Sequence, residues 1–144
     1  MKLKSFQTTM YACFVGYIIQ AIVNNFAPLL FLTFESEFGI PLSSITLLIT
    51  FNFLLQLVID LASVSFVDKI GYRVSAVLAN AFSAVGIILL TVLPSITPDP
   101  FVGLFVAVAI YAIGGGLLEV IISPIVEACS TADKETAMSV LHSF

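Results

Sequence analysis

Residues 101–128 read FVGLFVAVAIYAIGGGLLEVIISPIVEA, an apolar run whose only charged residues are Glu119 and Glu127. A hydrocarbon core about 30 Å thick takes roughly 20 helical residues to cross. The run is longer than that and is apolar along most of its length. It therefore predicts a membrane-spanning helix.

The composition extends this prediction to the whole chain. Of its 144 residues, 60% are hydrophobic and only 10% are charged, whereas a soluble domain carries about 25% charged residues. Most of the surface is therefore expected to face a lipid bilayer. With five Lys and Arg residues in total and no basic patch, we expect no nucleic-acid partner.

The apolar segments predict an all-α membrane protein with four transmembrane helices and the start of a fifth. Turn and cap signals separate the segments, among them Gly39, Gly71 and the proline-rich stretch 94–100. The expected helices cover about 7–33, 43–67, 72–93 and 101–128, and the fifth begins at about 134 and continues to 144.

The basic residues predict the orientation of these helices, because cytoplasmic loops are enriched in Lys and Arg. They lie before the first helix, between the second and third, and after the fourth, which are alternate connections on one side of the membrane. The N-terminus is therefore expected in the cytoplasm, and the plasma membrane is the expected location. An uncleaved N-terminus is also expected, because the first apolar run is too long for a signal peptide and no cleavage site follows it. The basic residues are Lys2, Lys4, Lys69, Arg73 and Lys134.

The first helix carries polar residues on one face. Tyr17, Gln20, Asn24 and Pro28 are spaced by three or four residues, and Asn25 lies beside that face. Pro28 cannot donate to the carbonyl of Asn24, so a kink is expected there. The amides can either pack against neighbouring helices or line a cavity, and the pattern leaves both alternatives open.

The second helix has a polar stripe formed by Asn52, Gln56, Asp60 and Ser63. A carboxylate at membrane depth costs several kcal/mol unless it is hydrated, paired or protonated. Asp60 is therefore either functional or held in a structural pair.

The fourth helix contains a third polar face, with Glu119, Ser123 and Glu127 beside Gly116. Glu119 lies near the middle of the span, where a carboxylate is least tolerated. Such a group can couple proton movement to transport, and the alternative is a buried structural carboxylic acid. The glycines 114–116 are poor helix formers and predict close helix contact or a flexible segment.

Known catalytic and metal-binding patterns are missing from the sequence. Cys13 and Cys129 have no metal-ligand spacing, and no GxxxxGK, HExxH or GxSxG pattern occurs. Asp60, Glu119 and His142 are conceivable catalytic groups, but no spacing links them. We therefore expect neither an enzyme nor a cofactor or metal site.

The connection between the second and third helices, Val64-Ser-Phe-Val-Asp-Lys-Ile-Gly-Tyr-Arg73, resembles the signature G-x-x-x-D-[RK]-x-G-[RK]-[RK] of the major facilitator superfamily. Val64 replaces the leading glycine and Tyr72 replaces one basic residue. The resemblance implies a cytoplasmic gate motif at the matching positions, which are Asp68, Lys69, Gly71 and Arg73.

Two further stretches resemble the fucose:proton symporter branch of that superfamily, namely 23–26 (VNNF) and 114–126 (GGGLLEVIISPIV). The resemblance implies proton coupling at Glu119 and a sugar cavity near Asn24, and places His142 at a polar cavity position of the fifth helix. Pro28 stands near the place of an aspartate expected in that branch, which puts fucose specificity in question. Asp60 is a possible substitute.

The resemblance implies that residues 1–144 are the partial N-terminal domain of a twelve-helix transporter whose remaining helices lie in the missing C-terminal part. The expected function is secondary active transport of a sugar or similar small polar solute, with protons as the expected coupling ion at Glu119 and Asp60. A complete small four-helix membrane protein, acting as an oligomer or accessory subunit, is the alternative. The expected substrate-cavity residues are Gln20, Asn24, Asn25, Asn52, Gln56, Ser123 and His142.

Overall fold

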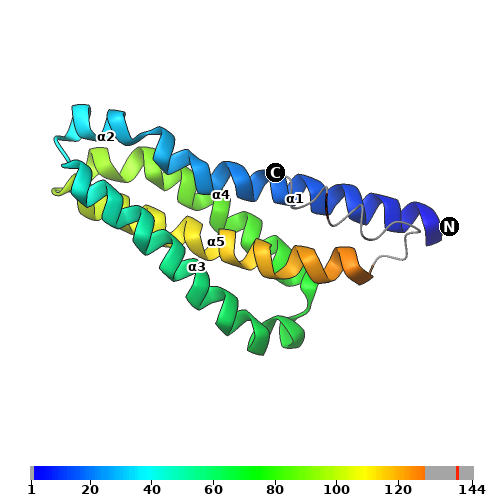
Figure 1. The fold of residues 1–144 in the computed structure, drawn as a ribbon. Helices are drawn as coiled ribbons and strands as arrows, with labels where there is room; N and C mark the ends of the chain where they lie inside the picture. The colour runs from blue at the N-terminus through cyan, green and yellow to red at the C-terminus, as the bar shows by residue number, and fades with distance from the viewer. Residues whose placement is uncertain (1, 129–138, 140–144) are drawn as a thin grey trace.

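The computed structural model describes residues 2–128 and residue 139. In this part of the chain the fold is all-helical (Figure 1). The predicted fifth helix, about 134–144, falls almost wholly outside the described residues, as does His142. The helices are α1 (Lys2–Leu29), α2 (Phe31–Phe38), α3 (Leu42–Ile70), α4 (Tyr72–Ile96) and α5 (Pro100–Ala128).

Local chemistry explains several helix ends. The Asp99 carboxylate accepts a hydrogen bond from the backbone N–H of Phe101 at 2.9 Å, and Pro100 occupies the first helical position, where it costs no hydrogen bond. Gly39 and Gly71 end α2 and α3 with φ of 64° and 86°, a backbone conformation that glycine adopts without a steric penalty.

Three of the helices in residues 2–128 are long and apolar enough to cross a membrane, over Leu42–Ser63, Tyr72–Ile96 and Pro100–Ala128. The first predicted span, about 7–33, is not among them. The helix that covers most of it, α1, is the least apolar of the four long helices. A first span therefore stays a prediction.

The N-terminal helical segment is interrupted close to Pro28. Helix α1 ends at Leu29, Leu30 has φ −92° and ψ 4°, and α2 begins at Phe31. Proline removes one helical hydrogen bond and its ring crowds the preceding turn. The break thus lies two residues beyond the proline at which the sequence predicts a kink.

Helix α5 forms the centre of the bundle. It packs most extensively against α4, and also against α3 and α1 (Figure 1). Most of its side chains in the apolar stretch are buried, in contrast to those of α3 and α4. The polar residues that α5 carries are therefore placed beside three other helices.

Backbones of α4 and α5 approach closely at glycines of both helices, among them Gly86 and Gly114. A Cβ atom added to Gly86 would lie 2.5 Å from the Tyr111 backbone nitrogen, and one added to Gly114 would lie 2.7 Å from the Ala79 carbonyl oxygen. Both distances are far below van der Waals contact. Close helix contact is therefore the role of Gly114, one of the two alternatives that the glycine run predicts.

Replacing Gly86 by Ala should destabilise the protein by about 1–3 kcal/mol, because the added methyl group forces the two backbones apart. The measurement is thermal unfolding of the full-length protein in detergent. The matched control is Ala84→Val, which enlarges a neighbouring exposed side chain of α4 and should leave the midpoint within experimental error. Equal midpoints for wild type and Gly86→Ala would contradict the packing argument.

Candidate functional site

Polar side chains from α1, α3 and α5 meet inside the bundle. Gln20 on α1 donates from Nε2 to Oε2 of Glu119 on α5 at 3.0 Å. Gln20 is 5% exposed and Glu119 is exposed, so this contact joins two helices at a partly buried position. The contact brings together a predicted cavity residue and the predicted proton-coupling residue.

A second set of contacts joins α1 to α3. Nε2 of Gln56 donates to Oδ1 of Asn24 at 2.6 Å and to Oδ1 of Asn52 at 3.3 Å. Gln56 and Asn52 are buried, and Asn24 is partly buried. Both asparagine oxygens act as acceptors here, which leaves their Nδ2 groups as donors for other partners.

Gly115 has no side chain, so the amide side chains of Gln56 and Asn24 can lie against α5 at this position. A Cβ atom at residue 115 would lie 3.0 Å from Gln56 Nε2 and 3.4 Å from Asn24 Oδ1. The three consecutive glycines thus face three different neighbours. Gly114 faces α4, Gly115 faces the amides of α1 and α3, and Gly116 faces Ile59 of α3.

Asp60 and Tyr17 lie within electrostatic range of Glu119. Asp60 is partly buried, and its Oδ1 has no hydrogen-bond partner among the described residues. Glu119 lies on an exposed face of α5 while it accepts from Gln20. Asp60 on α3 and Glu119 on α5 are thus two carboxyl groups from different helices that interact electrostatically.

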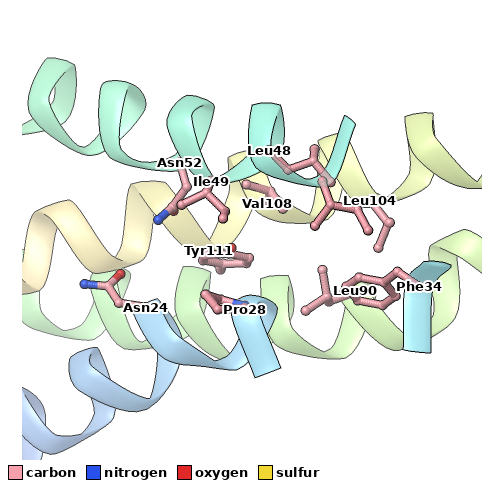
Figure 2. Close-up of a pocket in the computed structure, with 11 residues that line it drawn as sticks. Asn24, Pro28, Phe34, Leu48, Ile49, Asn52, Leu90, Leu104, Val108 and Tyr111 are labelled. Atoms are coloured by element: carbon pink, nitrogen blue, oxygen red, sulfur yellow. The ribbon is translucent and has the colours of Figure 1, made fainter. Parts of the chain in front are cut away.

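A small cavity adjoins the amide cluster (Figure 2). Its volume is about 10 Å³, close to the minimum that a single water molecule needs. Asn24, Asn52 and Tyr111 lie toward one end, and leucines with Phe34 lie toward the other. Tyr111 is 2% exposed, and it is a polar lining residue that the sequence analysis does not single out. Its only sequence signal is its position three residues before the glycine run.

Other predicted cavity residues lie apart from these contacts. Asn25 is exposed, and its Nδ2 donates to the Ala21 carbonyl of its own helix at 2.8 Å. Ser123 is partly buried on α5, in the turn that follows Glu119. His142 lies outside the described residues.

The predicted gate residues lie at the α3–α4 connection, where Asp68, Lys69 and Arg73 are exposed. Oδ1 of Asp68 accepts a hydrogen bond from the Tyr72 hydroxyl at 3.4 Å. The tyrosine that departs from the family signature therefore contacts the signature aspartate, and Gly71 makes the turn between the two helices.

The described residues form an all-helical bundle of long apolar helices, with amide and carboxyl contacts between the helices. This combination defines a multi-pass integral membrane protein with a polar interior. Solute transporters belong to this class. The profile of the Major Facilitator Superfamily matches residues 12–144. The chain belongs to this family, whose members are transporters. Comparisons with curated proteins and with solved structures each found no significant match. The resemblance to the fucose:proton symporter branch therefore stays a prediction.

Proposed function

We propose that this chain forms the N-terminal part of a secondary active transporter that moves a sugar or similar small polar solute in symport with protons. The observation that most directly supports the proposal is the hydrogen bond between Gln20 on α1 and Glu119 on α5. It joins a group that can bind a cation to the amides that can bind a solute. In this proposal α1 is the first of the spans, and the N-terminus is cytoplasmic in the plasma membrane.

The polar groups of the site suit a solute with several hydroxyl groups. Amides donate and accept hydrogen bonds, as hydroxyl groups do. Between residues 5 and 128 the only basic residues are Lys69 and Arg73, and both are exposed at the α3–α4 connection. Within residues 5–128 an anionic solute would therefore meet Glu119 and Asp60 and no positive side chain away from that connection. The proposed solute-binding residues are Gln20, Asn24, Asn25, Asn52, Gln56, Ser123 and His142.

The ion site and the gate are assigned to different residues of the bundle. Asp60 and Glu119 bind the coupling ion, for which the sequence predicts protons. Asp68, Lys69, Gly71 and Arg73 form the cytoplasmic gate, where Tyr72 holds the Asp68 carboxylate. The two halves of the complete protein then rock against each other and expose the site alternately to the two sides of the membrane.

The proposal is tested with full-length protein in proteoliposomes and a panel of labelled solutes. Neutral sugars and polyols, organic anions and organic cations are supplied under imposed proton and sodium gradients. We expect saturable uptake of at least one neutral polyhydroxylated solute and none in protein-free vesicles. Folded protein that moves no solute of the panel under any gradient would contradict transport. Uptake of anions alone would contradict the assigned solute class.

A further inference from the structure

Gly115 on α5 faces the amide side chains of two other helices. A Cβ atom at this position would lie 3.0 Å from Gln56 Nε2 on α3 and 3.4 Å from Asn24 Oδ1 on α1. The glycines on either side of it meet backbone atoms instead. A Cβ atom at Gly114 would lie 2.5 Å from the Ser83 nitrogen, and one at Gly116 would lie 3.2 Å from the Gln56 carbonyl oxygen. Gly115 is therefore the glycine of this run that borders the polar ends of the amide side chains.

A methyl group at residue 115 would act on the Gln56 amide and not on the helix backbones. The distance of 3.0 Å is shorter than ordinary van der Waals contact, at about 3.5–4.0 Å between heavy atoms. Nε2 lies at the end of a flexible side chain, which can move by a few tenths of an ångström. The three helices can therefore keep their places while the amide is displaced.

The position of the Gln56 amide matters because two asparagines depend on it. Nε2 donates to Asn24 Oδ1 at 2.6 Å and to Asn52 Oδ1 at 3.3 Å, so its displacement changes both distances at once. Asn24 and Asn52 lie at the polar end of the small cavity (Figure 2). With both Oδ1 atoms engaged, their Nδ2 groups are the donors left for a solute. The place of Gln56 thus decides which atoms the asparagines present, and where.

We propose that Gly115 determines the solute specificity of the transporter, because its missing side chain sets the position of the Gln56 amide and, through it, of Asn24 and Asn52. This inference rests on the proposed function. It adds a positioning residue that does not itself touch the solute. The site selects among neutral polyhydroxylated solutes by the direction in which their hydroxyl oxygens accept hydrogen bonds. Epimers differ in the direction of a single hydroxyl group, so they are the solutes that a displaced amide should rank differently.

Uptake of paired epimers by full-length protein in proteoliposomes tests the proposal. The pairs are glucose with galactose and mannitol with sorbitol, and the quantity measured is the ratio of kcat/KM within each pair. This ratio does not depend on the amount of folded protein, which multiplies both rates equally. Gly115→Ala should change the ratio by about tenfold, since a misplacement of 1 Å can cost about 10²-fold in rate. Its melting temperature should not fall, because alanine is the better helix former.

Gly16→Ala is the matched control. It makes the same substitution at a buried glycine of α1, where the added Cβ would lie 3.2 Å from Ile122 Cδ1 of α5. The new contact is about as close as that at Gly115, but it displaces an apolar side chain. The ratio of kcat/KM within each pair should therefore equal that of wild type.

A double-mutant cycle shows whether Gly115 acts through Gln56. In a Gln56→Ala background no amide lies beside residue 115, so adding Gly115→Ala should leave the ratio unchanged. The same shift in that background would overturn the proposal, as would a wild-type ratio in Gly115→Ala. Unfolded Gly115→Ala beside folded Gly16→Ala would make residue 115 a packing position and overturn it too. Each of these results leaves the proposed function intact, whereas folded wild type that takes up no solute refutes both.

Discussion

Replacing Glu119 by Gln should abolish ion-driven solute accumulation and leave solute exchange across the membrane measurable. Glutamine has nearly the shape of glutamate and can still accept from Gln20 Nε2, so the contact at 3.0 Å between α1 and α5 is kept. What is lost is the negative charge, and with it the binding of a coupling cation. The accumulated solute should fall to the concentration outside the vesicles.

The control for this experiment is Glu127→Gln, which makes the same chemical change two turns further along α5, at an exposed position. It should accumulate solute as wild type does. Both variants are assayed in two modes, namely uptake driven by a gradient and exchange of labelled for unlabelled solute. Full accumulation by Glu119→Gln would refute the assignment of Glu119 as an ion-binding group, whichever ion drives transport.

Replacing Gln56 by Leu should lower kcat/KM for solute transport about 10- to 100-fold. The leucine removes Gln56 Nε2, the donor that serves Asn24 Oδ1 and Asn52 Oδ1 in the described part of the chain. Each buried acceptor left without a donor costs about 1–3 kcal/mol, so the two asparagines are expected to turn and present different atoms to the solute. Initial uptake rates over a range of solute concentrations give the change in kcat/KM.

Thr50→Val is the control for Gln56→Leu. Thr50 lies on the same helix, is exposed, and donates only to the Thr46 carbonyl at 3.1 Å. Losing that local bond should leave solute transport within about twofold of wild type, since no other helix is affected. A Gln56→Leu variant with wild-type kcat/KM and a wild-type melting temperature would show that the amide contacts do not position the solute site.

Helical periodicity is sufficient to predict which residues share a face. The stripe on α3 is one example, since Asn52 and Gln56 are both buried and hydrogen-bond to each other. Asn25 is a second example, since it is placed beside the polar face of the first helix and is exposed in the structure. A spacing of three or four residues determines these relations within one helix.

Partners on different helices could not be predicted in the same way. Gln20 and Glu119 are 99 residues apart in the sequence, and their contact depends on the rotation and depth of α1 relative to α5. The rotation and depth of a helix depend on the contacts that its glycines make with neighbouring helices. A glycine run in the sequence does not indicate which neighbour each glycine will face. Tyr111 was missed for a related reason, because an isolated tyrosine in an apolar helix has no spacing that distinguishes a cavity position from a lipid-facing one.

The glycines between α4 and α5 also constrain how this sequence can change over evolutionary time. Gly86 and Gly114 each face atoms of the opposite helix at distances that exclude even a methyl group, so a change at either position needs a compensating change in the other helix. Exposed residues such as Ala84 carry no such requirement. Descendants of this chain should therefore diverge freely on their lipid-facing surfaces while the line of contact between α4 and α5 stays the same.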